Sequence, residues 1–574
     1  MAVVSMEDLA LPAWLGLDDP LDADGAAMCE LDAGTSVVRV LSRADVCARS
    51  LALARAVRAA CGAADGCAHS APPVASAALA AFAHAREDGG GVQPVIGVSV
   101  DEGAALALCH LAAWRLGAAI VPLDPRDPDA RYARLARAVR PAAVLCKPAD
   151  AARIGGVLAA AGVRAAVVAV PPRAEALLAG AADGAERGGR TAHDGGGNGD
   201  GARALDAISH VFFTSGTSGE PKGCVVTHRA LASYALAKNV AHAVGRRSTV
   251  FIASSLTFDP SLGDIAATLA AGGTIAMAST RDAVRDALGA CLRATRATHV
   301  QCTPGLWASV WPDTPPLPDL RVVALGGEPM GAQLADAWAE RVVLLNTYGV
   351  TEATVYQTAH RVRGAADCRL LGAPLRGVSA FLCRTSSDES VDGGEGIACG
   401  EAGGEGLLAA DGDVGELVLG GVQVGCGYLP PLPTALGAVD ASAQRADGAP
   451  DARDAPHRFV TLASEAALRA LGPDLGAPDW GAIAGEWPAS DGGDPVVTQR
   501  SEYWRRDAAD AAAADDASGA ALRARPADRL RLYRTGDLVR RVRVSARGGM
   551  REFCPLRPVS YTHLRAHGTD SYLV

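Results

Sequence analysis

Lysine and aromatic residues are scarce in this chain of 574 residues. Aromatic residues make up 4% of it, and lysine occurs only at Lys147, Lys222 and Lys238, so nearly all positive charge is arginine. A lysine inside a motif is therefore more informative than usual. The formal net charge is −10, which argues against a surface for nucleic acid or a polybasic membrane contact.

Long apolar runs and paired cysteines are also missing. No apolar run reaches about 18 residues, so no membrane span is expected. The N-terminus carries Glu7 and Asp8 and no basic start, unlike a signal peptide. The 14 cysteines form no C-x-x-C pair and no zinc-spaced cluster with histidine. They indicate reduced thiols in a cytoplasmic protein, while the 49% hydrophobic content excludes general disorder.

Short apolar strands alternate with helix-length segments in the middle of the chain. The segment from Leu111 to Leu123 predicts a helix, a glycine turn and a buried strand. Further candidate strands are His210–Phe213, Val250–Ala253, Thr274–Ala278, His299–Cys302, Val322–Leu325 and Val342–Leu345. This alternation predicts βαβ units and a mostly parallel sheet, with ligands at the loops beyond the carboxyl ends of the strands.

Composition divides the chain further. We expect an N-terminal extension over 1–35, a first αβ subdomain over 36–180, a Gly-rich loop over 181–207, a second αβ subdomain with a phosphate loop over 208–380, a low-complexity insertion over 381–411, a β-rich subdomain over 412–430, a largely disordered insertion over 431–530 with a short patch at Arg458–Leu462, and the end of the large domain over 531–557. Residues 558–574 resemble translated vector sequence, and we expect them to be non-native.

A hydroxyl- and glycine-rich segment follows an apolar strand at residues 210–223, HVFFTSGTSGEPKG. Glycines let backbone N–H groups converge on one point, hydroxyls add donors, and Lys222 adds a positive charge. A helix is expected to begin near His228. A linker would have a similar composition, but the preceding strand and the rare lysine favour an anion site. Its candidate phosphate ligands are Thr214, Ser215, Gly216, Thr217, Ser218, Gly219 and Lys222.

TSGTSGEPKG resembles the phosphate-binding signature of the adenylate-forming superfamily, which includes acyl-CoA synthetases, luciferases and peptide-synthetase adenylation domains. Residues 346–352, NTYGVTE, and 533–538, YRTGDL, resemble two further signatures in the family order. Supporting matches are GAAIVPLDPRDP at 117–128, LGGEP at 325–329 and GELVLGGVQVGCGY at 415–428. The resemblance covers about residues 36–380 and 412–557.

The resemblance implies a role for each motif residue. Tyr348 would pack on adenine with Asn346 near its edge, Thr351 would contact the α-phosphate, and Glu352 would hold Mg²⁺. Asp537 would accept hydrogen bonds from both ribose hydroxyls, as a carboxylate can. The catalytic candidates are therefore Lys222, Thr351 and Glu352.

The resemblance also implies a pocket for the acid. In TFDPSLGD, residues 257–264, Asp259 matches an aspartate that pairs with the ammonium group of an α-amino acid, and Phe258 lies beside the reacting carboxylate. The remaining pocket candidates are Gly263, Gln301, Val323, Leu325, Thr347, Val355 and Tyr356. The segment TFDPS resembles the beta-alanine-activating branch, acyl-CoA synthetase family member 4, at least as closely as it resembles peptide synthetases.

Together these matches imply an α/β protein with two mostly parallel αβ-layered sheets and a β-rich subdomain, the large N-terminal domain of an adenylate-forming ligase. Its substrates would be ATP with Mg²⁺ and a small carboxylic acid, with an amino acid favoured. The acyl-AMP would pass to coenzyme A or to the phosphopantetheine of a carrier protein domain.

The match fails at one point. Family members carry a lysine in a small C-terminal domain that contacts the reacting carboxylate, whereas this sequence has no lysine beyond Lys238. The catalytic lysine and the small domain are therefore expected to be missing, and adenylation by this chain to be weak or absent.

Two other functions stay open on the sequence. A fatty or aryl acyl-CoA synthetase would need no amine partner, and Asp259 would then be structural. A non-catalytic nucleotide-binding or scaffolding protein would use the long insertions for interactions.

Overall fold

The computed structural model describes residues 11–15, 17, 25–31, 37–64, 93–100, 102–171, 205–215, 221–310, 316–383, 414–429, 459–461, 531–543 and 551–555. Its helices are η2 (Ala13–Leu15), α1 (Arg43–Ala64), α3 (Ala104–Arg115), α4 (Asp129–Val139), η4 (Pro148–Asp150), α5 (Ala151–Ala160), α8 (His228–Ala241), α9 (Asp259–Ala270), α10 (Arg281–Ala294), α11 (Pro304–Trp307), α12 (Ala332–Trp338) and η5 (Thr351–Ala353).

One sheet has seven strands in the order β18-β8-β7-β4-β3-β5-β6. Their bounds are β3 (Val95–Ser99), β4 (Ala119–Pro122), β5 (Ala143–Cys146), β6 (Ala166–Ala169), β7 (Ile208–Ser215), β8 (Pro221–Thr227) and β18 (Gly427–Tyr428). β3 to β7 pair in parallel, while β8 and β18 add two antiparallel strands at one edge. The segment 111–123 forms the end of α3, a turn at Gly117 with φ 64°, and β4, as the sequence predicts.

A second sheet has nine strands in the order β15-β14-β13-β12-β11-β9-β10-β1-β2. Their bounds are β1 (Ala26–Leu31), β2 (Val37–Ser42), β9 (Thr249–Ile252), β10 (Thr274–Ala278), β11 (His299–Cys302), β12 (Val322–Gly326), β13 (Val343–Tyr348), β14 (Thr358–Val362) and β15 (Ala373–Pro374). The pairs from β1 through β10, β9, β11 and β12 to β13 are parallel, and the outer strands are antiparallel. The prediction of two mostly parallel sheets is confirmed.

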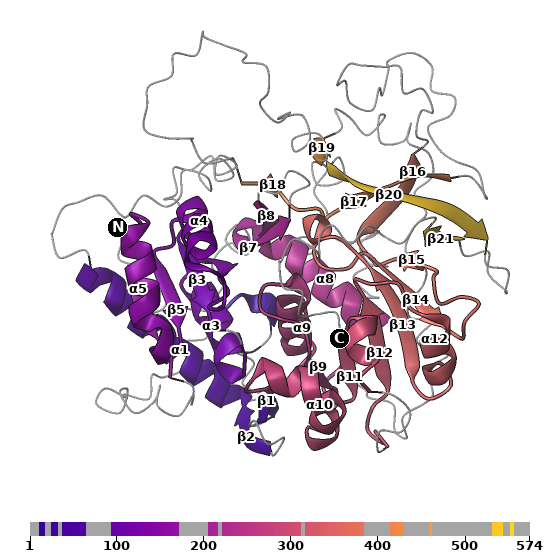
Figure 1. Cartoon of the computed structure of the whole chain (residues 1–574), viewed down its shortest axis with the longest axis horizontal. Helices are drawn as coiled ribbons and strands as arrows, with labels where there is room; N and C mark the ends of the chain where they lie inside the picture. Colours follow the sequence, from indigo (N-terminus) through magenta and orange to yellow (C-terminus); the bar gives the residue numbers. More distant parts are fainter. Residues whose placement is uncertain are drawn as a thin grey trace, which may run out of the picture.

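A smaller antiparallel sheet completes the described fold. It contains β16 (Val378–Cys383), β17 (Val414–Gly421), β19 (Phe459–Thr461), β20 (Arg531–Arg543) and β21 (Arg551–Pro555). This is the expected β-rich part, and the patch near residue 459 contributes a strand to it. Figure 1 shows this sheet above the nine-stranded sheet, with β17 and β20 side by side.

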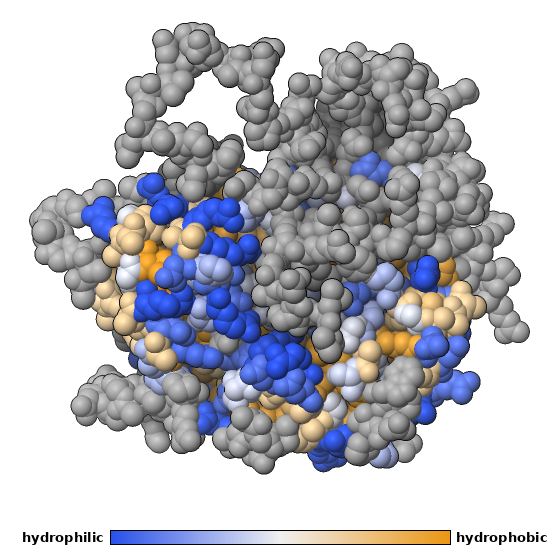
Figure 2. Space-filling view, in the orientation of Figure 1, coloured by the Kyte–Doolittle hydropathy of each residue, from blue (hydrophilic) through white to orange (hydrophobic). Residues whose placement is uncertain are grey.

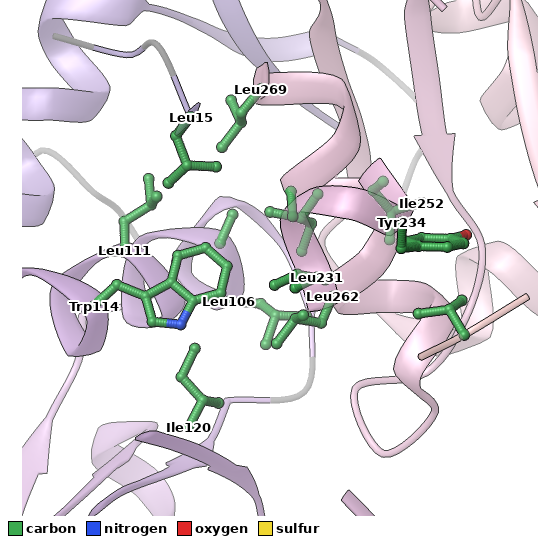
Figure 3. Close-up of a cluster of buried hydrophobic side chains, with 14 of the residues drawn as sticks. Leu15, Leu106, Leu111, Trp114, Ile120, Leu231, Tyr234, Ile252, Leu262 and Leu269 are labelled. Carbon is green, nitrogen blue, oxygen red and sulfur yellow. The ribbon is translucent and has the colours of Figure 1, made fainter. Parts of the chain in front are cut away.

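Helices cover both faces of the two large sheets. α3, α8 and α9 lie in the middle of the molecule (Figure 1), where a central core unites them with inward-facing residues of both sheets. In Figure 3, Leu106 and Trp114 of α3 face Leu231 of α8 and Leu262 of α9 across this core. Separate apolar clusters join α4 and α5 to the seven-stranded sheet and α10 to α12 to the nine-stranded sheet. The sheets are therefore the two inner layers between three layers of helices.

Several strands pair in a different sheet from the one that the expected division into subdomains would suggest. The hairpin β7–β8, expected to open the second αβ unit at residue 208, belongs to the seven-stranded sheet. β1, expected in an N-terminal extension, pairs in parallel with β10 in the nine-stranded sheet. β18, expected in the β-rich part, pairs with β8. Local composition does not encode these long-range pairings, and the expected boundaries stay predictions. Residues 172–204, 384–413, 430–458, 462–530 and 556–574 lie outside the described residues.

The described residues include no candidate membrane helix, and ten cysteines have described side chains. Among the described residues, no helix combines the length and the apolar character needed to cross a membrane. Figure 2 shows a face on which hydrophilic residues intersperse with small apolar areas. The ten cysteines whose side chains are described form no disulfide.

Candidate active site

The candidate phosphate loop joins two antiparallel strands. Thr214 pairs with Lys222 and Ser215 with Pro221, so the strand runs two residues further than the sequence suggests. β8 then leads into α8, which begins at His228 as predicted and is capped by the Thr227 hydroxyl, an acceptor for the Ala230 N–H at 3.2 Å. β8 itself was not foreseen, because its start contains Pro221 and Gly223. Residues 216–220, including Gly216, Thr217, Ser218 and Gly219, lie outside the described residues.

Lys222 and Glu352 meet through a tyrosine. The Lys222 ammonium lies 5.7 Å from the centre of the Tyr428 ring, a cation–π distance. The Tyr428 hydroxyl donates to Glu352 Oε1, and the Thr214 hydroxyl lies 3.5 Å from the same oxygen. Three segments that are far apart in the sequence therefore converge: the hairpin, η5 and β18.

The YRTGDL segment reaches the same place. Tyr533, on β20, is fully buried, and its hydroxyl lies 3.2 Å from that of Tyr428. The Thr535 hydroxyl donates to the Leu417 carbonyl of β17 at 2.7 Å, which anchors the strand. Asp537 follows two residues later on β20, where the structure describes the backbone but not its side chain. Its predicted ribose contact stays a prediction, made on a strand that adjoins the site.

Glu352 presents an orphaned oxygen. The residue is 1% exposed, and its Oε2 has no hydrogen-bond partner, while Oε1 takes the contacts with Tyr428 and Thr214. A buried carboxylate oxygen without a donor is costly unless a cation or donor completes it. In the described part of the chain, no three His, Cys, Asp or Glu side chains gather to bind a metal. One free carboxylate oxygen fits Mg²⁺, which proteins commonly hold through one or two carboxylates plus substrate phosphates.

The loop around Glu352 is held in a strained conformation. Thr354 and Val355 have φ values of 71° and 66°, which β-branched residues rarely adopt. Gln357 fixes the loop, since its Oε1 accepts the Val350 N–H at 2.7 Å and its amide donates to the carbonyls of Ala353 and Thr354. The Thr354 hydroxyl donates to Gln423 O at 2.6 Å. Strain held by so many bonds is typical of a loop that must present particular groups.

The two residues expected beside adenine are largely enclosed. Tyr348, at the end of β13, is 4% exposed and belongs to the central core. Asn346 donates its amide to the Leu370 carbonyl at 2.8 Å, so this donor already serves the fold. Thr351, at the start of η5, remains half-buried.

Asp259 begins α9 and lies beside the strained loop. It is 7% exposed, and its Oδ2 accepts the Val355 N–H at 3.2 Å. Burial, helped by the nearby Glu352, raises the pKa of Asp259 to about 7, although hydrogen bonds from Thr351 and Val355 act in the opposite direction. Phe258, the N-cap residue of α9, precedes it and is half-buried. Asp259 is thus adjacent to the predicted metal and α-phosphate ligands, as the family resemblance implies.

Strand register divides the predicted pocket residues of β11 and β12 between the two faces of the sheet. Val323 and Leu325 of β12 pack with Val300 and Cys302 in the cluster beneath α10 to α12. Gln301 lies between those two β11 residues and therefore faces the opposite side of the sheet.

The same face carries other residues on the neighbouring strands. Gln301 pairs with Ala324, and Gly326 pairs with Thr347. A Cβ on Gly326 would lie 2.4 Å from Thr347 Oγ1 and 2.7 Å from Tyr356, so Gly326 belongs with the pocket candidates. The predicted Val323 and Leu325 lie on the opposite face, because successive side chains of a strand alternate between the two faces of a sheet.

Gly263 does not open space in the pocket. A Cβ there would lie 2.9 Å from the Tyr234 ring and 3.0 Å from Val355, so both neighbours already fill its place. Thr347 donates its hydroxyl to the Leu325 carbonyl at 3.1 Å. The described pocket candidates on the same side of the nine-stranded sheet as Gln301 are, with Gln301 itself, Asp259, Gly263, Gly326, Thr347, Val355 and Tyr356.

Comparison with known proteins decides the family. The model of the AMP-binding enzyme family matches residues 75–429, more than half of the 574 residues. The chain belongs to the AMP-binding enzyme family. The predicted membership of the adenylate-forming superfamily is thereby confirmed.

Relatives of this AMP-binding enzyme include the hybrid PKS-NRPS synthetase TAS1 of Botryobasidium botryosum, 32% identical over 39% of this chain and 13% of the relative. Novobiocin biosynthesis protein H of Streptomyces niveus is 30% identical over 60% of this chain and 52% of the relative. The chain thus spans about half or less of the length of these curated relatives.

The fold agrees with solved structures. The N-terminal subdomain of Klebsiella oxytoca NpsA, in complex with 3-hydroxybenzoyl-AMSN, has a TM-score of 0.57 at 14% identity, and the match covers 96% of this chain and all of that one.

Sequence reasoning on this AMP-binding enzyme missed three tyrosines. Tyr428 ends the GELVLGGVQVGCGY match and Tyr533 opens YRTGDL, but neither was assigned a role. Tyr428 follows Gly427 at a strand end, which is an available signal, whereas Tyr533 follows Leu532 inside β20 and is marked only by its place in the motif. Tyr234, in the middle of α8, gave no signal, because only folding brings it against Gly263.

Proposed function

We propose that this protein activates a small carboxylic acid, with an amino acid favoured, by transferring AMP from ATP to its carboxylate. The acyl-AMP then passes its acyl group to a thiol, either of coenzyme A or of a carrier domain's phosphopantetheine. The observation that carries the proposal is the contact series Lys222–Tyr428–Glu352, joined by Tyr533, because it unites all three family signatures in one place.

Charge explains how such a site would work. A carboxylate that attacks the α-phosphate brings two anions together, so catalysis consists of positioning and electrostatic stabilisation. Lys222 and the N–H groups of residues 214–219 would take charge from the leaving pyrophosphate. Thr351 would hold the α-phosphate, with Asp537, Tyr348 and Asn346 on the nucleoside.

Glu352 would hold Mg²⁺ through its orphaned Oε2. When bound, the ion supplies neutralisation of phosphate charge. The enclosed carboxylate and its Tyr428 contact fix where that charge is placed.

Asp259 supports the amino-acid form of the proposal. A buried carboxylate with a raised pKa gains from a cationic partner, and a substrate ammonium group is such a partner. An acid without an amine would leave this carboxylate uncompensated. This distinguishes the proposal from a fatty or aryl acyl-CoA synthetase, which would tolerate Asp259→Ala.

ATP binding and ATP–pyrophosphate exchange test the proposal. We expect micromolar to millimolar ATP binding by calorimetry, weakened about tenfold or more by Lys222→Ala or Glu352→Gln, because each removes a charge that faces phosphate or metal. Exchange should require an added acid.

Two variants serve as matched controls. Lys147 follows β5, three strands away from β7 in the same sheet, and Glu340 is exposed after α12. Lys147→Ala and Glu340→Gln should leave ATP binding unchanged. If ATP did not bind, or if Lys147→Ala weakened it as much as Lys222→Ala, a scaffolding function would be favoured.

A further inference from the structure

A group of polar side chains lies near Asp259. Tyr234 of α8, Gln301 of β11 and Tyr356 form what we call the polar floor. All three are buried, at 0%, 2% and 9% exposure. In Figure 3 the Tyr234 hydroxyl points away from Leu231 and Leu262, out of the apolar core.

The polar floor has unused hydrogen-bonding capacity. Tyr234 Oη and the side-chain Oε1 and Nε2 of Gln301 are buried, and no protein atom lies in hydrogen-bonding geometry to them. The Gln301 amide is close enough to act on the pKa of both phenols, although burial raises the pKa of Tyr234 and Tyr356 well above the usual range. Buried polar groups of folded proteins are rarely left without partners, since each one costs about 1–3 kcal/mol.

Charge in this region is already balanced. Lys238 of α8 forms a fully buried ion pair with Asp264 of α9. Asp264 acts on the pKa of both phenols, and Lys238 neutralises this carboxylate. Asp259, at the other end, faces the proposed ammonium group. A charged side group reaching the floor would find no counter-charge there, and burial would penalise it strongly.

Two glycines limit the space. Tyr234 and Val355 fill the position beside Gly263, and Thr347 and Tyr356 fill that beside Gly326, so no side chain fits at either. A ligand that reaches the floor must therefore be short.

We propose that the acid activated here carries a short, uncharged hydrogen-bonding group, such as a hydroxyl or a carboxamide, which completes the bonds of Tyr234 and Gln301. The inference rests on the proposed function and specifies its substrate class. A site that hydrogen-bonds a substrate group discriminates strongly against an analogue without it, because its own buried groups are then left unpaired.

Isosteric pairs of acids test this inference. We would measure displacement of ATP from the full chain by aminoacyl-sulfamoyl adenosines of threonine, valine, asparagine, leucine and aspartate. Threonine should bind at least about tenfold more tightly than valine, or asparagine than leucine, and aspartate should bind at least about tenfold more weakly than asparagine. Equal or tighter binding of valine and leucine would overturn the inference and leave the proposed function intact.

Substitutions locate the selectivity. Tyr234→Phe and Gln301→Leu preserve shape and should reduce the polar preference to about threefold or less. Tyr132→Phe, at a fully buried tyrosine of α4 outside this region, is the matched control and should keep the preference. A preference that survives both floor variants would also refute the inference. If no analogue displaced ATP, the proposed function itself would be wrong, and the inference would fail with it.

Discussion

Asp259 shows at the scale of one residue how a binding group can be costly to the fold. Its carboxylate is enclosed and has a pKa near 7, against an ordinary value of 3.8. A group with a raised pKa stabilises the fold at low pH, and this contribution is lost as pH rises through 7. The ionised carboxylate at pH 8 is therefore held at a cost that a bound ammonium group would offset.

This pKa predicts the pH dependence of amino-acid binding. Only ionised Asp259 can pair with ammonium, so affinity should be maximal above pH 7 and fall about tenfold per unit below it, towards pH 5. Calorimetric titration between pH 5.5 and 8.5, in the presence of ATP, measures this. A carboxylic acid without an amine should show no such dependence, and an unchanged affinity for the amino acid across this range would contradict the prediction.

The same residue predicts a trade-off between stability and binding. Asp259→Asn should raise the melting temperature at pH 8 by a few degrees, since the buried charge is removed, while abolishing amine-dependent binding. The gain should shrink at pH 5, where wild-type Asp259 is already protonated. A lower melting temperature at pH 8 would show that the carboxylate is needed structurally.

At the scale of an element, the turn between β13 and β14 depends on one buried glutamine. Gln357 is fully buried and holds Val350, Ala353 and Thr354. Gln357→Leu should destabilise the protein by about 1–3 kcal/mol, because a buried N–H and two carbonyls lose their partner. Chemical denaturation measures this loss of stability, and Gln333→Leu, at an exposed position of α12, is the control.

The same substitution has a functional consequence. The turn carries Thr351 and Glu352 at one end and Val355 against Asp259 at the other. Gln357→Leu should therefore weaken ATP and amino-acid binding together. Loss of stability with fully retained binding of both ligands would show that Gln357 supports the core and not the site.

At the scale of the whole molecule, three buried histidines lie where α3, α8 and β7 meet. His110 has no hydrogen-bond partner on either nitrogen, and His210 Nε2 and His228 Nδ1 also lack one. Trp114 packs edge-on against His228 at 5.5 Å. Burial lowers the pKa of each histidine to about 3, so the folded state holds all three neutral.

Acid should therefore unfold the protein early. Unfolded histidine takes up a proton near pH 6.5, so this stability is fully present above pH 6.5 and is lost as pH falls towards 3. Each histidine should cost about 2 kcal/mol at pH 5. The melting temperature should fall between pH 7.5 and 5, and fall less in His110→Phe. Equal falls in both proteins would contradict this account.

Sequence alone determined the family, the two parallel sheets and the identity of the phosphate, metal and ribose candidates. Local apolar patterns located β10 and β11 with the observed bounds, and glycine, hydroxyl and acidic residues at fixed spacing marked the loops. These features are local, because a strand or an anion loop is encoded by neighbouring residues.

Tertiary structure alone decided which segments share a sheet, which residues of β12 share a face with Gln301, and that Tyr428, Tyr533 and Tyr234 reach the candidate site. Each of these depends on pairing or packing between residues far apart in the chain. A strand can satisfy the same local pattern in either of two registers, and only contact with its neighbours selects one.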